Sequence, residues 1–210
     1  MVDNRKRIVM DQPDSEVSQK YFNIAERIKY YSGNNKKALL FLSEQEKEGK
    51  TTIASNIAIA LAKKGGNIVF LDADLESPSI HDTFNVTLRN GISDAIATDK
   101  SILSVTYDTP QYGLSTIHAG LKRSIGNELF LSNKFKYAVD TLKNKYDYII
   151  IDVGMGMNDS ACLDAIKEAV DAVVVVQSDE RYTLETDNLM ERLKQKDIEV
   201  LGVINNFVEG

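Results

Sequence analysis

The chain has 210 residues, 43% of them hydrophobic, and a formal net charge of −6. This size and composition favour one globular domain spanning residues 1–210, and the acidic balance excludes a general electrostatic attraction to nucleic acid or anionic lipid. The apolar runs are too short to cross a membrane, and residues 1–16 lack the apolar centre of a signal peptide. We therefore expect a cytoplasmic protein that neither inserts into a membrane nor binds nucleic acid.

A polar N-terminal arm over residues 1–14 comes first, followed by a predicted helix over residues 15–31. Apolar residues from Val17 to Ile28 recur at i, i+4 and i+7, which is the spacing of one helix face. A second helix is predicted from Thr51 to Lys64, because its apolar residues share one face and two glycines follow it.

Short apolar runs alternate with helical patterns along the rest of the chain. They do not alternate with polar residues, and such runs are typical of strands covered on both faces. The sequence thus predicts an α/β fold, with a mostly parallel sheet flanked by helices on both faces. The predicted strands are ALLFLS from Ala38, NIVFLD from Asn67, DYIIID from Asp147, DAVVVVQ from Asp171 and EVLGVIN from Glu199, with GLSTIHAG from Gly113 as a weaker sixth.

The stretch SEQEKEGKTT, residues 43–52, joins the first strand to the second helix. A strand, a loop ending in Gly-Lys-Thr and a helix form the context of a phosphate-binding P-loop. Backbone N–H groups from Gly49 would cradle phosphate, Lys50 would reach the terminal phosphates, and the Thr51 hydroxyl would bind Mg²⁺. The competing interpretation is a lysine-containing helix cap, which leaves two acidic strand ends unexplained.

Those acidic strand ends are the sequences LDAD and IIID. Asp72, Asp74 and Asp152 each follow an apolar strand, and ligands of open α/β sheets bind at the carboxyl ends of strands. Three converging carboxylates would repel one another unless a cation lay among them, and Mg²⁺ takes oxygen ligands of this kind. The alternative is that each aspartate caps the turn or helix after its strand.

Together these motifs resemble those of the bacterial tyrosine kinases (BY-kinases), kinase modules of capsule and exopolysaccharide regulation within the MinD/ParA group of P-loop NTPases. The family loop S-x-x-P-G-E-G-K-[ST] appears here as SEQEKEGKTT. The family motif D-x-D-x-R-x-P appears as DADLESP, and the Walker B strand as YDYIIID. The similarity covers nearly the whole chain.

This resemblance implies that the chain binds ATP or ADP with Mg²⁺. It also implies a membrane adaptor as partner, which would recruit the protein to the inner face of the membrane. The implied site residues are Gly49, Lys50, Thr51 and Thr52 at the phosphates, Asn206 at the adenine, Thr51, Asp72 and Asp152 at the metal, and Asp74 with Lys50 in catalysis, Asp74 as the base toward a tyrosine hydroxyl.

The chain departs from the family around the site. Family Pro and Gly in the loop become Glu46 and Lys47, and the family Arg of the second motif becomes Glu76. The Pro-Pro after the Walker B aspartate becomes Gly154-Met155. If residue 47 needs a positive φ, a lysine there costs about 1–2 kcal/mol, which weakens nucleotide binding without abolishing it.

The assembly features depart as well. The family motif E-x-x-R-x-x-R, which drives assembly of an octameric ring, corresponds here to Gln19, Phe22 and Ala25, and the sequence shows no tyrosine-rich tail. We therefore expect a monomer or small oligomer. We expect a regulator of capsular or exopolysaccharide synthesis that binds ATP and has weak or absent tyrosine kinase activity.

Two alternatives remain open at this point. One is a MinD/ParA-like positioning ATPase, although Gln45 stands where those proteins carry a signature lysine. The other is an interaction scaffold that binds no nucleotide. ATP-dependent dimerisation would support the first alternative, and the absence of any thermal shift with nucleotide would support the second.

Overall fold

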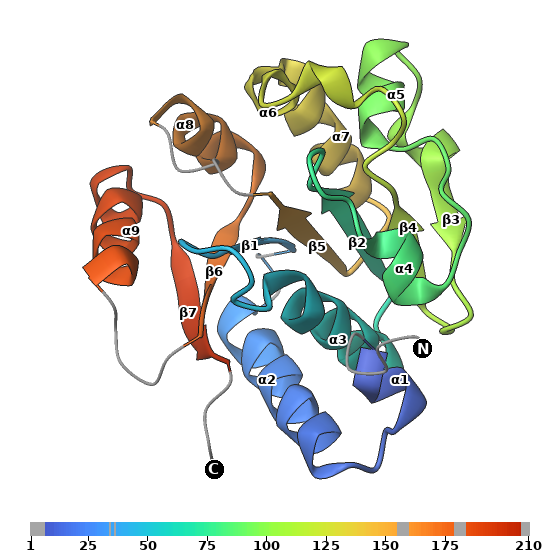
Figure 1. The fold of residues 1–210 in the computed structure, drawn as a ribbon, viewed down its shortest axis with the longest axis vertical. Helices are drawn as coiled ribbons and strands as arrows, with labels where there is room; N and C mark the ends of the chain where they lie inside the picture. Colours follow the sequence, from blue (N-terminus) through green and yellow to red (C-terminus); the bar gives the residue numbers. More distant parts are fainter. Residues whose placement is uncertain (1–6, 34, 36, 155–159, 179–183, 207–210) are drawn as a thin grey trace.

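A seven-stranded sheet forms the centre of the computed structural model, which describes residues 7–33, 35, 37–154, 160–178 and 184–206. The strand order is β3-β4-β2-β5-β1-β6-β7, and only the edge strand β3 runs antiparallel to its neighbour. Figure 1 shows β1 in the middle of the sheet, between β5 and β6. The strands are β1 (Ala38–Leu42), β2 (Ile68–Ala73), β3 (Thr106–Asp108), β4 (Leu114–Ile117), β5 (Tyr148–Val153), β6 (Ala172–Gln177) and β7 (Val200–Asn205).

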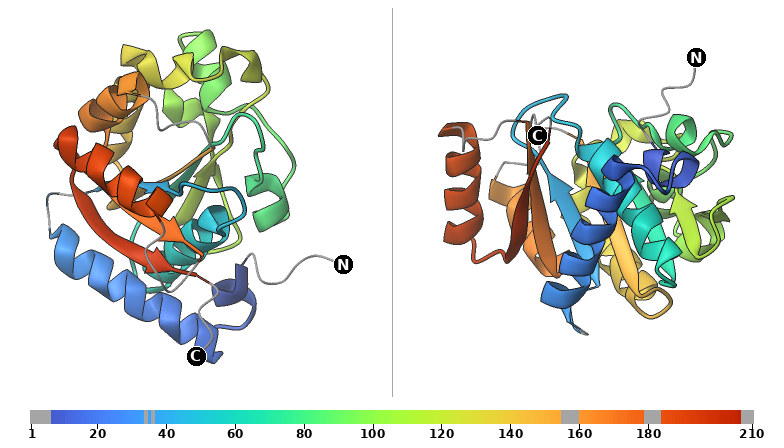
Figure 2. Two further views of the ribbon diagram at one scale, coloured as in Figure 1. Left: turned by 60° about the vertical axis from the view of Figure 1, so that its left-hand side comes forward. Right: turned by 90° about the horizontal axis from the view of Figure 1, so that it is seen from below.

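Helices cover both faces of this sheet (Figures 1 and 2). The first face carries α1 (Ile8–Asp11), α2 (Glu16–Ser32), α3 (Lys50–Lys63) and α4 (Ile80–Phe84). The second carries α5 (Ile92–Ala97), α6 (Glu128–Leu131), α7 (Asn133–Lys143), α8 (Ser160–Ala169) and α9 (Leu184–Gln195), with the short 3₁₀ helices η2 (Ile102–Val105) and η3 (Arg123–Ile125). The predicted fold class is confirmed.

The central strands are apolar throughout because both of their faces are buried. Every residue of β1, β2, β5 and β6 is buried, and their side chains divide between two core clusters, one on each face. All six predicted strands are present, including the weaker one, which is β4. Strand β3 was not predicted, because its three residues have no apolar run and it pairs only along the sheet edge.

Both predicted helices form within one residue of the expected bounds. The Ser15 hydroxyl accepts a hydrogen bond from the Ser18 N–H at 3.2 Å and so caps α2. Gly65 has a φ of +86°, a left-handed conformation that favours glycine, just after α3 ends. Between Ile53 and Ala62 every residue of α3 is buried, since this helix lies between the sheet and α2.

Part of the polar N-terminal arm is folded. Residues 8–11 form α1, where Val9 is fully buried and its N–H donates to Asn56 Oδ1 of α3 at 3.0 Å. A few apolar residues within a polar stretch give no periodic signal, so the sequence pattern missed this element. Within the described residues, no helix combines the length and apolar character needed to span a bilayer.

Candidate nucleotide-binding site

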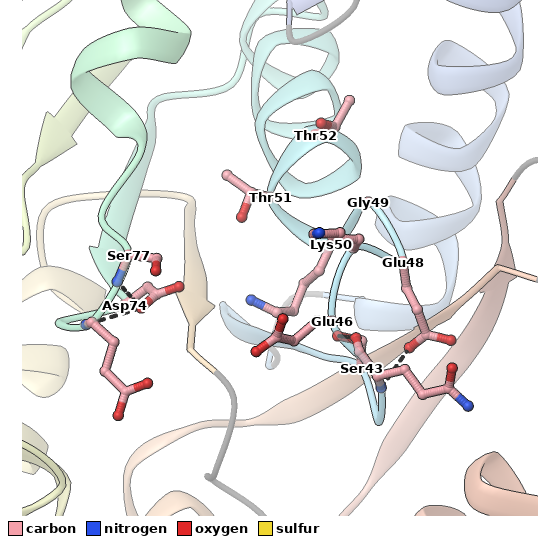
Figure 3. Close-up of a pocket in the computed structure, with 12 residues that line it drawn as sticks. Ser43, Glu46, Glu48, Gly49, Lys50, Thr51, Thr52, Asp74 and Ser77 are labelled. Carbon is pink, nitrogen blue, oxygen red and sulfur yellow. Dashed lines mark hydrogen bonds between the residues drawn. The ribbon is translucent and has the colours of Figure 1, made fainter.

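The candidate site lies at the carboxyl edge of the sheet, where the loop after β1 leads into α3. A pocket of about 360 Å³ is lined by this loop and the start of α3 on one side, and by Asp74, Glu76 and Ser77 on the other. Figure 3 shows Lys50 and Thr51 at the N-terminus of α3, across the pocket from Asp74 and Ser77. This is the crevice in which open α/β sheets bind ligands.

The loop has two segments with different support, which we call the leading segment (residues 43–48) and the phosphate segment (residues 49–52). Gly49 has a φ of +85°, and its carbonyl accepts the first intrahelical bond, from Ile53 N–H at 2.9 Å. The N–H groups of the first turn of a helix have no intrahelical partner and attract anions. The phosphate segment thus has the local geometry of a P-loop.

Lys50, Thr51 and Asp152 come together beside this helix terminus. Lys50 Nζ lies 2.9 Å from Asp152 Oδ1 and also donates to the Val153 carbonyl. The Thr51 hydroxyl donates to Asp152 Oδ2 at 2.6 Å. Asp152 is 1% exposed, and its carboxylate accepts hydrogen bonds from the Lys50 and Thr51 side chains.

Asp72 lies beside Asp152, because β2 and β5 are adjacent and the two aspartates are in register. The Asp72 carboxylate is 1% exposed and accepts N–H bonds from Asp74, Ser79 and Ile80 at 3.0–3.1 Å. Burial, followed by the charge of Asp152, raises the pKa of Asp72 to about 7, against the lowering effect of these bonds. Asp72 therefore caps the following turn and also faces a second carboxylate.

The predicted metal site between three carboxylates stays a prediction, and the described residues support only a pair of them. The described residues contain no group of three His, Cys, Asp or Glu side chains that could hold a metal. Asp74 comes after the last residue of β2, and its Oδ1 accepts the N–H groups of Glu76 and Ser77 at 3.1 and 2.8 Å. These bonds tie the Asp74 carboxylate to its own loop.

The remaining pair still fits Mg²⁺. Asp72 and Asp152 are adjacent buried carboxylates, and the pKa of Asp72 is raised, so a divalent cation between them would stabilise their charged forms. Mg²⁺ is bound by one or two carboxylates together with phosphate and water, and the Thr51 hydroxyl, bonded to Asp152, would be available as a further oxygen ligand. A cluster of three protein carboxylates is therefore not required.

Asp74 has a close neighbour in Gly154. A Cβ added to Gly154 would lie 2.8 Å from Asp74 Oδ1. The family proline at this position would therefore collide with Asp74 as it is placed here. The position of the Asp74 carboxylate thus depends on the glycine at residue 154. The sequence motifs did not indicate this dependence.

The leading segment contains the substituted residues. Lys47 has a φ of +63°, which confirms that a non-glycine residue occupies a left-handed position. Glu48 is 4% exposed, and its carboxylate accepts the N–H groups of Gln45 at 3.0 Å and Ser178 at 3.3 Å. No local sequence pattern indicates this role of Glu48, since its bond to Ser178 joins residues 130 positions apart.

Asn206, predicted to face the adenine, lies directly after β7 and next to the loop. Its Nδ2 donates to the Glu48 carbonyl at 2.9 Å, and its N–H donates to the Gln177 carbonyl at 2.7 Å. Asn206 is therefore close to the P-loop and holds part of the leading segment in place. Its adenine contact stays a prediction.

Comparison with known proteins agrees with this geometry. The sequence model of the ParA family, described as the NUBPL iron-transfer P-loop NTPase, matches residues 35–209. The putative tyrosine-protein kinase CapB of Staphylococcus aureus is 31% identical over 145 residues, which cover 69% of this chain and 64% of CapB. The putative tyrosine-protein kinase EpsB of Ralstonia nicotianae is 28% identical, over 97% of this chain and only 27% of EpsB.

A solved structure is similar as well. The chimerical protein CapA2B2 superposes with a TM-score of 0.88 at 26% identity, covering 98% of this chain and 91% of that one. These matches confirm the resemblance drawn from the loop, the second aspartate motif and the Walker B strand. They do not favour the positioning-ATPase alternative, because the named sequence relatives are kinases.

Proposed function

Because this chain belongs to the ParA family of P-loop NTPases, and among them to the bacterial tyrosine kinases, we propose that it binds MgATP and MgADP in the pocket at the start of α3. It would regulate capsular or exopolysaccharide synthesis, with weak or absent tyrosine kinase activity. The convergence of Lys50 and Thr51 on Asp152 beside this pocket carries the proposal.

Phosphate binding rests on the phosphate segment, Gly49 to Thr52. The N–H groups of the first α3 turn would bind the phosphate oxygens, and Lys50 would exchange its bond to Asp152 for one to the terminal phosphate. Bound Mg²⁺ would neutralise phosphate charge, held by Thr51, Asp152 and Asp72. The adenine would lie toward Asn206.

The charged groups at the opening of the pocket are the reason that we expect weak phosphoryl transfer. Glu46, Asp74 and Glu76 line the pocket, so acidic side chains surround the position where the terminal phosphate would lie. Phosphoryl transfer depends on positioning and on positive charge that stabilises the transition state. The family arginine is absent here, and the Asp74 carboxylate is already bonded to two N–H groups, so it is a poorly placed base.

The proposed partner is a membrane adaptor of a polysaccharide-assembly system, and the proposed state is a monomer or small oligomer. Ala25, at the last position of the ring-assembly motif, is fully buried in the core between α2 and α3. It therefore presents no charged group to a neighbouring subunit. Light scattering that shows a stable octamer would contradict this part of the proposal.

Calorimetric titration of MgADP and MgATP into the purified protein tests the binding site, and incubation with radiolabelled ATP and the adaptor tests the activity. We expect saturable binding of both nucleotides and little phosphotyrosine. Strong phosphotyrosine that disappears in Asp74→Asn would overturn the weak-kinase proposal. Absence of binding at millimolar nucleotide would overturn the nucleotide site itself.

A further inference from the structure

We propose that Arg192 of α9 is a positioning residue for the leading segment of the nucleotide loop, and that it acts through Glu44. Arg192 Nη2 lies 2.9 and 2.8 Å from the two carboxylate oxygens of Glu44. The pair joins residues 148 positions apart in sequence. The inference rests on the nucleotide site proposed above. It assigns a residue outside the pocket that affects nucleotide affinity through the shape of the loop.

The leading segment needs support from outside the loop. Gln45, Glu46 and Lys47 are exposed, and Lys47 is held at a positive φ that an ordinary side chain avoids. Within the loop itself, the Ser43 hydroxyl donates to the Gln45 carbonyl at 3.2 Å. A strained and exposed backbone persists only where surrounding contacts define its position.

Those contacts come from the C-terminal third of the chain. Ser178, just after β6, donates to the Glu48 carboxylate, and Asn206, just after β7, donates to the Glu48 carbonyl. Arg192 of α9, which lies between these two strands in sequence, binds Glu44. The leading segment is thus held at its two ends, by Glu48 and by Glu44, to the unit formed by β6, α9 and β7.

The Arg192 contact acts on the pocket without being part of it. The lining of the pocket includes Gln45, Glu46 and Lys47 but no residue of α9. These three residues directly follow Glu44 in the chain, so the position of Glu44 affects where they lie. The Glu44 side chain is 19% exposed and that of Arg192 is 37% exposed, so solvent screens this pair less than a fully exposed one.

A second ion pair at the end of the same helix supplies a matched control. Lys196, directly after α9, binds Asp164 of α8 with Nζ 2.7 Å from a carboxylate oxygen. Lys196→Met removes one positive charge and one inter-element ion pair, as Arg192→Met does, but it does not touch the loop. A general loss of helix anchoring would affect both variants alike.

The experiment compares wild type, Arg192→Met, Glu44→Gln and Lys196→Met by hydrogen exchange of residues 44–49 in the nucleotide-free protein and by MgADP titration. We expect Arg192→Met and Glu44→Gln to raise exchange in this segment and to weaken MgADP binding about fivefold, with Lys196→Met unchanged in both. The charge swap Glu44→Arg with Arg192→Glu should recover more than half of the lost affinity. Melting temperatures show which variants are folded.

Exchange and affinity in Arg192→Met and Glu44→Gln equal to those in Lys196→Met would overturn the inference. The two readouts separate this inference from the proposed function. If the wild-type protein binds no MgADP, the proposed nucleotide site fails, and the exchange data alone decide whether Arg192 positions the loop. Should Arg192→Met not fold, Glu44→Gln tests the same contact from the loop side.

Discussion

The two segments of one loop are held by different kinds of interaction. The phosphate segment is organised by its own glycine and helix terminus and by Asp152 of the adjacent strand β5. The leading segment has a strained lysine and depends on Ser178, Arg192 and Asn206, which lie at least 130 residues away in sequence. The residues that would bind phosphate and the shape of the loop before them are therefore determined by different sets of contacts.

Removing the lysine of the phosphate segment gives the largest expected effect. Lys50→Met should abolish measurable MgADP binding, and it should lower the free energy of unfolding by about 3–5 kcal/mol because Asp152 loses its buried cation. Calorimetry and urea unfolding measure the two quantities. Lys63→Met, an exposed lysine at the end of the same helix, is the control and should change neither. Nucleotide binding retained in Lys50→Met would contradict the assignment of phosphate binding to the phosphate segment.

The pH dependence of stability tests the carboxylates beside the phosphate segment. The pKa of Asp72 is about 7 in the nucleotide-free fold and near 4 when unfolded, so the unfolded state releases its proton at lower pH. Asp72 therefore makes the protein less stable as pH rises from about 4 to about 7, by about 4 kcal/mol in total. Urea unfolding at pH 5 and pH 8 should measure about two thirds of this loss, because the unfolded carboxyl is already mostly ionised at pH 5.

Asp72→Asn is the control for that measurement, because it removes the titration. His118 has the opposite effect on stability: burial lowers its pKa to about 4, so the protein becomes more stable as pH rises through this range. This effect is the same in wild type and in Asp72→Asn. The difference between wild type and Asp72→Asn thus isolates Asp72. If the stability of wild type and of Asp72→Asn changed equally with pH, the raised pKa of the buried Asp72 carboxyl would be contradicted.

A substitution at Gly154 tests the region opposite the loop. Gly154→Ala places a Cβ 2.8 Å from Asp74 Oδ1, and the carboxylate should leave the N–H groups of Glu76 and Ser77. We expect a loss of about 1 kcal/mol in the free energy of unfolding. The matched control is Gly202→Ala in β7, where an added Cβ has no neighbour within 4 Å. Equal stability of the two variants would show that Asp74 does not depend on Gly154.

The smallest effect is expected from relief of strain in the leading segment. Lys47→Gly should raise the free energy of unfolding by up to about 1 kcal/mol, because glycine adopts a φ of +63° without steric conflict. Glu46→Gly, next to it, should lower stability by about 0.5 kcal/mol, since it only adds chain entropy to the unfolded state. Thermal unfolding of the pair measures the difference. A Lys47→Gly variant no more stable than Glu46→Gly would mean that residue 47 carries no strain.

Much of the fold could be predicted because its signals are local. The apolar runs of β1, β2, β5 and β6 reflect burial on both faces, and the glycines at 49 and 65 mark a loop and a helix end. Helix α1 and strand β3 were missed because their few residues have no periodicity of their own. Each of these short elements forms only against a neighbour that is already folded.

The sequence by itself determined the Gly-Lys-Thr motif, the acidic strand ends, six of the seven strands and the two helices α2 and α3, since each has a signal in residues adjacent in the chain. Only the tertiary structure decided that Asp72 pairs with Asp152 while Asp74 stays in its own loop, because strand register sets which carboxylates meet. It also decided that Glu48 and Glu44 hold the leading segment. Their partners lie more than a hundred residues away, and no local pattern specifies a contact over that distance.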